Sequence, residues 1–211
     1  MPMTSKNCFG AFGMVNTYNS KESKLLIRVR ALEQRWKGLV RDLQHGLITI
    51  EEYQLFELPF TQSLLEGLGK LPEIGTTART FVGTSFFIKR SGLPTMVISI
   101  DDSGIFRAEP ENASNPTMPE IEFADTNLYI EGILWLSSRE RFLKAYVGGA
   151  IKVHELHRFR KWAPYVLALL LKIDRDIYQR IVCSAAESID QVQCRNEHSF
   201  TAASRSRHPT G

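Results

Sequence analysis

The feature that most limits how this 211-residue chain can fold is a regular spacing of apolar side chains between residues 25 and 43. These side chains recur at alternating steps of four and three residues: Leu25, Val29, Leu32, Trp36, Leu39 and Leu43. Because an α-helix turns once in about 3.6 residues, they share one side of a helix. The spacing predicts a long amphipathic helix that is capped by Asn19 or Ser20 and ends at His45 and Gly46.

Two shorter helices are expected after this one. Thr49 and Glu52 have the spacing of a capping box, in which each side chain satisfies a backbone amide at a helix start. The second helix should end before Pro59, because the residue that precedes a proline is disfavoured in helical geometry. A third helix is predicted over residues 61–68, so that residues 19–70 form an all-helical extension.

From about residue 79 the pattern changes, because β-branched and aromatic residues gather in short runs separated by turn residues. Met96, Ile98 and Ile100 alternate with other residues and therefore share one face of a strand. Strands are predicted at residues 79–89, 94–101, 105–108, 120–131 and 150–154, and helices at residues 132–147, with a break at Ser137 and Ser138, and at residues 158–182. The predicted fold class is α+β, with a mainly antiparallel sheet covered by helices.

The rest of the chain divides by composition. Residues 1–18, rich in Gly, Ser, Thr and Asn, are predicted to be a flexible arm, and residues 79–183 to be the α+β domain. Residues 184–211 are polar and are predicted to be a disordered tail. Within the domain the inward positions change parity between Phe123 and Leu128, which indicates a bulge or break near Asp125.

The charge is unevenly distributed although the net formal charge is only +3, which does not indicate a nucleic-acid partner. Residues 21–45 carry seven basic and three acidic side chains, and residues 139–161 carry seven and two. Residues 101–125 carry one basic and seven acidic side chains. One interpretation is a set of solvated faces that compensate one another. The other is a basic surface that makes peripheral contact with anionic lipid headgroups.

Cysteine usage and hydropathy bear on location. The three cysteines, Cys8, Cys183 and Cys194, are an odd and sparse set that fits a reducing compartment. The first twenty residues hold no apolar run of signal-peptide length. The longest strongly apolar stretch, residues 165–171, is far shorter than the roughly 20 residues of a membrane span. A cytoplasmic protein is expected.

No catalytic constellation stands out, so the sequence predicts a protein without enzymatic activity, metal or cofactor. His154, Glu155 and His157 are close in sequence, but they lack the spacing of a metalloprotease site. Cys183 has no partner base in the pattern. The acidic residues between 101 and 122 fit turns and edge strands better than paired catalytic carboxylates, and no glycine-rich phosphate loop is present in the sequence.

The aromatic and aliphatic residues of the β-rich half suggest a binding function. A small sheet with one apolar face, followed by short helices that are apolar on several sides, encloses more apolar surface than its own side chains fill. The predicted lining of this pocket is Phe87, Met96, Ile98, Ile100, Ile130, Ile133, Phe142 and Tyr146. The opposing interpretation is that these residues simply fill the core.

Three segments also resemble the lipid-binding domain of the sterol carrier protein type two family. They are residues 96–102 with Gly104, residues 124–130 (Ala-Asp-Thr-Asn-Leu-Tyr-Ile), and residues 149–153 (Gly-Ala-Ile-Lys-Val). The resemblance covers residues 81–173. It implies a five-stranded sheet covered by helices, a hydrophobic tunnel for a fatty-acyl, sterol or similar chain, and no chemistry of its own.

A second hypothesis places the function in the first helix. The four-three spacing over residues 21–44 is compatible with a short coiled coil, so Leu25, Val29, Leu32, Trp36, Leu39 and Leu43 can pair with a second copy or with a partner chain. The chain would then be an interaction or scaffold module. The sequence does not choose between a binding pocket and this interface.

Overall fold

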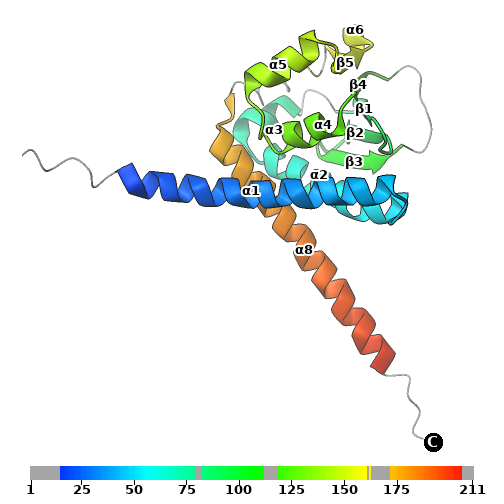
Figure 1. Cartoon of the computed structure of the whole chain (residues 1–211). Coiled ribbons are helices and arrows are strands. Elements are labelled where there is room, and N and C mark those ends of the chain that lie inside the picture. Colours follow the sequence, from blue (N-terminus) through cyan, green and yellow to red (C-terminus); the bar gives the residue numbers. More distant parts are fainter. Residues whose placement is uncertain (1–14, 79–81, 112–117, 161, 163–171, 206–211) are drawn as a thin grey trace, which may run out of the picture.

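The computed structural model describes residues 15–78, 82–111, 118–160, 162 and 172–205. A five-stranded sheet is covered by helices, and two long helices pass beside it, α1 (Val15–Gln44) and α8 (Arg175–Arg205) (Figure 1). The predicted α+β class is confirmed. Helix α1 contains the predicted stripe but begins earlier than expected, since residues 15–18 of the predicted arm are already helical.

Helix α2 (Ile50–Gly69) begins with the predicted capping box. The Thr49 hydroxyl accepts from the Glu52 amide at 3.2 Å, and the Glu52 carboxylate accepts from the Thr49 amide at 2.7 Å. The expected stop at Pro59 is wrong, because α2 continues through it and absorbs the predicted third helix. Pro59 has no N–H to donate to the Leu55 carbonyl, so one helical hydrogen bond is missing. Both residues are exposed, so the missing bond lies on the solvent side of α2. A short helix, α3 (Pro72–Ala78), follows.

The sheet contains β1 (Ser85–Arg90), β2 (Met96–Ile100), β3 (Phe106–Pro110), β4 (Glu120–Phe123) and β5 (Ile151–His154). Its strand order is β3-β2-β1-β4-β5. The first three strands form the predicted antiparallel meander. Strand β4 pairs with β1 in parallel, so the sheet is mixed, although its other pairs are antiparallel.

The predicted strand over residues 120–131 is correct only for its first half. It ends at Phe123, and Asp125 then caps helix α4 (Thr126–Ile133) by accepting a hydrogen bond from the Asn127 amide. The change of parity after Phe123 therefore marks a strand-to-helix boundary rather than a bulge. Helix α5 (Arg139–Val147) is capped by Ser138, as the predicted break at Ser137 and Ser138 requires.

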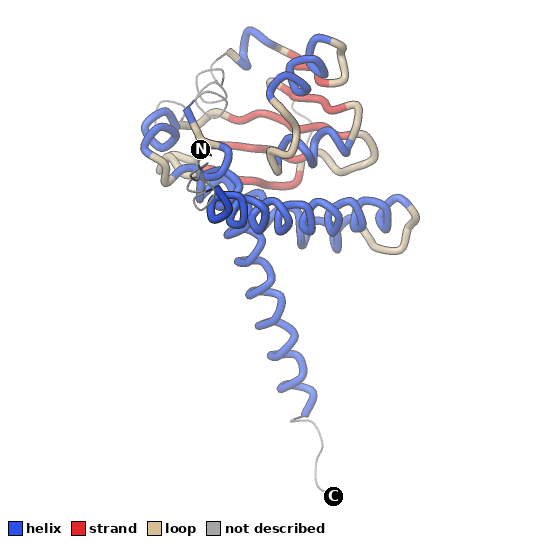
Figure 2. Tube along the Cα trace, turned by 60° about the vertical axis from the view of Figure 1, so that its left-hand side comes forward, coloured by secondary structure: helices blue, strands red, loops and turns tan. Residues whose placement is uncertain are grey.

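The C-terminal half also differs from expectation. The single helix predicted over residues 158–182 is interrupted, because α6 (Leu156–Phe159) is short and α8 begins at Arg175, after Asp174 accepts from the Asp176 amide. The predicted disordered tail is helical as far as Arg205, and α8 projects away from the sheet (Figure 2). Residues 161 and 163–171 of the predicted helix lie outside the described residues.

The apolar stripe of α1 packs within its own chain. Val29, Leu32 and Trp36 are buried, while Leu25, Leu39 and Leu43 pack against the core at its edge. Helix α2 is joined to the edge of the sheet, where the Gln62 amide bonds both the Phe106 carbonyl, at 2.8 Å, and the Ala108 amide, at 2.9 Å. In this structure the stripe therefore serves the core, and the front helices share that core with the sheet.

Close packing of α2 on α8 gives a first prediction. A Cβ atom at Gly67 would overlap the Ile181 Cγ2 atom, whereas nothing lies within 4 Å of a Cβ at Gly38 in α1. We expect Gly67→Ala to lower the free energy of unfolding by about 1–3 kcal/mol, because the β-branched Ile181 is stiff. The control, Gly38→Ala, should raise it by about 0.5–1 kcal/mol. Urea denaturation of both variants checks this; equal effects would contradict the packing.

Candidate functional site: an apolar cavity

A cavity of about 230 Å³ lies between the sheet and helices α2, α4 and α5. The strands supply Phe86, Ile88, Ile98, Ile121 and Phe123; α2 supplies Thr61, Leu64, Leu65 and Leu68; α4 supplies Tyr129, Gly132 and Ile133; the following loop and α5 supply Trp135, Ser137, Ser138, Arg139 and Phe142; and α8 supplies Tyr178. The lining is mostly apolar with a few polar groups, which is typical of sites for apolar small molecules.

Strand alternation and register build the floor of the cavity. Residues two apart on a strand point to the same face, so Phe86 and Ile88 face the cavity together. The register pairs Phe86 with Ile98 of β2 and Ile88 with Ile121 of β4. These four side chains therefore lie side by side across three adjacent strands, where they form a continuous apolar surface.

Helices α4 and α5 close over this floor. A Cβ atom at Gly132 of α4 would lie 3.0 Å from the Phe142 ring, so the glycine lets the ring approach α4 closely. Helix α5 contains no fully buried residue, and Phe142 is only partly buried. The cavity is therefore covered on this side by a helix with few core contacts.

The few polar groups of the lining gather mainly around the loop before α5. Ser137, Ser138 and Arg139 lie there, and the Arg139 guanidinium is 5.5 Å from the centre of the Trp135 ring. Thr61, on α2, is buried, and its hydroxyl has no hydrogen-bond partner among the described residues. A ligand would thus meet an apolar interior and a cation near one end.

Helix α8 fixes this loop by holding Trp135 in a strained conformation. Trp135 has a φ of 49°, which is unfavourable for a residue with a side chain. Its carbonyl accepts from Arg175 at 3.1 Å and from Gln179 at 3.2 Å, while its ring packs edge-on against Tyr178 at 5.1 Å. The Tyr178 hydroxyl donates to the Ile133 carbonyl, and burial raises the pKa of this phenol.

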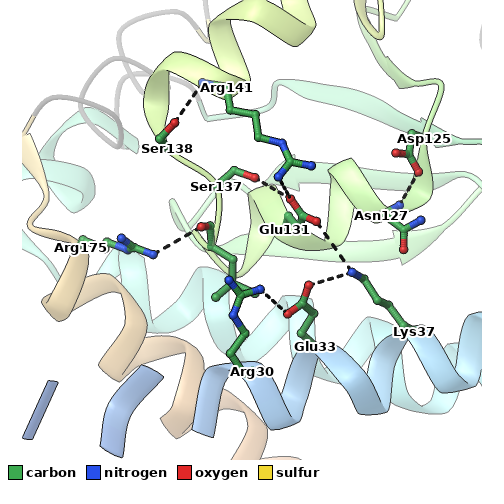
Figure 3. A network of polar contacts seen from close by, with 11 residues as sticks. Arg30, Glu33, Lys37, Asp125, Asn127, Glu131, Ser137, Ser138, Arg141 and Arg175 are labelled. Carbon is green, nitrogen blue, oxygen red and sulfur yellow. Dashed lines mark hydrogen bonds and ion pairs between the residues drawn. The ribbon is translucent and has the colours of Figure 1, made fainter. Parts of the chain in front are cut away.

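A polar network ties the same loop and α5 to α1 (Figure 3). Glu131 of α4 accepts from Ser137 at 2.8 Å, and its carboxylate lies 3.1 Å from the Arg141 guanidinium and 3.8 Å from Lys37. Lys37 in turn lies 2.8 Å from the buried Glu33. Charged residues of three helices thus hold the polar side of the loop in place.

A buried ion pair lies next to the cavity and links the helices to the sheet. Arg90 of β1 pairs with Glu57 of α2, and both side chains are inaccessible to solvent. The Tyr129 hydroxyl lies 3.2 Å from Arg90 and 3.3 Å from Glu57, and Arg90 also donates to the Pro94 carbonyl. Burial raises the pKa of Glu57, an effect that Arg90 and two tyrosines oppose.

The predicted lining residues have three different locations. Ile98, Ile133 and Phe142 line the cavity. Met96, Ile100 and Ile130 are buried in the core but are not among its lining residues. Phe87 lies on the opposite face of β1, because alternation places Phe86 and Ile88 inward, and Tyr146 is 45% exposed on α5.

Sequence reasoning missed the α2 side of the cavity and chose the wrong face of β1. Taking residues 50–69 as one helix would have placed Thr61, Leu64, Leu65 and Leu68 on one side, facing the sheet. On β1 the exposed Lys89 lies on the same face as Phe87. An exposed lysine was a correct signal that this face does not line the cavity. That signal was masked because Arg90, on the inward face, is also charged yet buried.

The predicted reactive groups occupy other places. His154 bonds Glu122 at 2.9 Å and holds the pKa of that carboxyl below its usual range, while His157 lies 3.4 Å from Glu155. Glu120, Glu122 and His154 form a cluster with ligand atoms within 4.8 Å of one another. Lys89, at 2.6 Å from Glu120, and Lys152, at 3.9 Å from Glu122, already neutralise these carboxylates. Cys183 is buried, and burial raises the pKa of its thiol.

Comparisons with known proteins give a weak structural likeness. No family model matches the chain, and no curated protein matches it. A solved structure described as "UbiJ-SCP2 Ubiquinone synthesis protein" is similar to 51% of this chain and to 91% of its own, at 16% sequence identity and a TM-score of 0.39. Residues 124–130, one of the three segments that resemble the sterol carrier family, contain the start of α4.

Proposed function

We propose that this chain binds an apolar small molecule in the cavity between the sheet and helices α2, α4 and α5, without catalysing a reaction. The observation that carries the proposal is the apolar lining built by three strands and four helices of the fold. An empty cavity of this size lowers the stability of the fold, because the side chains that line it lose van der Waals contacts. A bound ligand restores those contacts.

The size of the cavity defines the class of ligand. Its volume of about 230 Å³ equals the liquid volume of roughly eight water molecules, and a methylene group is of similar size. A chain of about eight carbons therefore fills it. Burial at about 0.8 kcal/mol per methylene gives about 6 kcal/mol, which corresponds to a dissociation constant between millimolar and micromolar.

Arg139 favours a carboxylate at the end of this chain. Its guanidinium is exposed and borders the cavity near Ser137 and Ser138, so that a headgroup can pair with it while the chain enters the apolar interior. We therefore infer that a medium-chain fatty acid, or a lipid that inserts a segment of this length, is the ligand class.

Isothermal titration with octanoate, octanol and acetate tests the proposal. Octanoate should bind with a dissociation constant between millimolar and micromolar. Octanol should bind more weakly, because it lacks the negative charge that pairs with Arg139, and acetate should not bind measurably. Equal responses to octanoate and acetate would show that only surface charge is involved. Absence of binding by both eight-carbon compounds would overturn the proposed function.

A further inference from the structure

Helix α5 carries apolar side chains on the side that faces away from the cavity. Leu143 is 60% exposed, Val147 is 85% exposed and Tyr146 is 45% exposed. Leu143 and Val147 are four residues apart and therefore adjacent on the helix surface. Their neighbours Phe142 and Ala145 are the partly buried residues that pack inward. The helix is thus apolar on two sides, and only one of them is covered.

Basic side chains surround this exposed apolar side. Helix α5 carries Arg139, Arg141 and Lys144 against one acid, Glu140, and all four are exposed. Lys144 lies 2.7 Å from Glu140 and Arg141 lies 3.1 Å from Glu131, so the helix and its acidic neighbours keep a net positive charge. Helix α6 adds Leu156, which is 58% exposed, and the exposed Arg158, and the exposed Arg160 follows the helix. Both helices lie at the end of the domain remote from the C-terminal half of α8 (Figures 1 and 2).

The region around the turn between α1 and α2 offers a comparison, because it exposes apolar side chains beside acidic residues. The turn between α1 and α2 exposes Leu47, at 73%, and the first half of α2 exposes Leu55, at 68%. The turn lies beside Glu51 and Glu52, which are exposed acids at the start of α2. An anionic surface would repel that turn, whereas it would attract the basic residues around Leu143 and Val147.

We propose that the α5–α6 surface, defined by Leu143, Tyr146, Val147 and Leu156 with the basic residues around them, docks on an anionic lipid bilayer. Apolar side chains enter the interface between headgroups and acyl chains, and Lys and Arg pair with anionic headgroups. No described helix has the length and apolar character to span a bilayer, so the contact is made from one side.

Docking in this orientation places the cavity next to the bilayer. Arg139 and Phe142 of α5 line the cavity, while Leu143 and Val147 of the same helix meet the lipid. A ligand could then pass between the bilayer and the cavity beside a helix that has few core contacts. This role in ligand entry rests on the proposed function, whereas the docking itself does not.

Flotation of the full chain with vesicles tests the docking. Vesicles of phosphatidylcholine with about one-third phosphatidylserine should bind the protein, pure phosphatidylcholine should bind it far less, and high salt should weaken binding. The double variant Leu143→Glu/Val147→Glu should lose at least about tenfold in partitioning. Lys144→Gln, which keeps the apolar pair, should lose up to about fivefold.

Leu47→Glu/Leu55→Glu is the matched control, because it places the same charges on two equally exposed leucines outside the surface. It should partition like the parent chain. Failure of the parent chain to bind anionic vesicles, or equal loss in the two double variants, would overturn the docking proposal. Octanoate titration of the same α5 variant separates the two proposals, since binding in solution should persist when vesicle binding is lost.

Discussion

Replacing Arg90 with methionine is expected to lower the free energy of unfolding by about 3–5 kcal/mol, the largest effect of any single substitution considered for this chain. The substitution leaves Glu57 in a site with 1% side-chain exposure, without its cation and with the tyrosine hydroxyls as its remaining partners. It also removes a donor to the Pro94 carbonyl. Chemical denaturation monitored by tryptophan fluorescence measures the loss.

Two further variants identify the cause. Arg90→Met/Glu57→Leu removes both charges and should regain most of the lost stability, because a buried ion pair and an apolar pair are often of similar stability. Arg107→Met breaks an exposed ion pair, in which Arg107 lies 3.0 Å from Asp101. This variant should lower the free energy of unfolding by less than about 1 kcal/mol. A small loss in Arg90→Met, similar to that in Arg107→Met, would show that the pair is not buried as described.

Replacing Ile133 with tryptophan is expected to weaken octanoate binding at least about tenfold, or about 1.4 kcal/mol. Ile133 lies on α4 and lines the cavity, so the larger indole ring occupies space that the acyl chain requires. Since the ring fills a void, we expect the free energy of unfolding to change by less than about 1.5 kcal/mol. Titration calorimetry and urea denaturation measure the two quantities on the same protein.

Ile177→Trp is the control for the added ring. Ile177 is 47% exposed on α8 and is not among the lining residues of the cavity, so this variant should bind octanoate as the parent chain does. If Ile133→Trp kept full affinity while remaining folded, octanoate would bind elsewhere. Equal weakening in both variants would point to a general effect of the extra tryptophan.

The sequence predicted those elements whose signals are local. Helix α1 and the capping box at Thr49 depend on neighbouring residues alone, and both are present in the structure. The strands β1, β2 and β3 follow from alternation and turn residues in the same way. The parallel pairing of β4 with β1 was not predictable, because no local signal distinguishes it from a continued meander.

Tertiary contacts overrode local signals in two places. Pro59 would end an isolated helix, but buried side chains on both sides of it, Phe56 and Phe60, hold α2 together. The polar composition after residue 184 predicts disorder, yet Ala185 and Ile189 are buried and Glu187 pairs with Arg28 of α1. In both cases, packing against another helix stabilises the structure.

For the cavity, the sequence prediction and the structure overlap in part. Of the residues predicted to line an apolar pocket, Ile98, Ile133 and Phe142 lie at the cavity. The choice of Phe87 over Phe86 failed because Arg90, a charged residue, lies on the inward face. Only knowledge of its partner Glu57, 33 residues earlier, explains that burial.

The most direct test of the binding cavity is a titration with octanoate followed by NMR of labelled isoleucine methyl groups. Ile88, Ile98, Ile121 and Ile133 line the cavity, whereas Ile105 and Ile177 are exposed elsewhere. The methyl signals of the four lining residues should shift together and saturate with one dissociation constant. The methyl signals of the two exposed residues should not shift. Shifts confined to the exposed residues, or no shifts at saturating octanoate, would contradict the account.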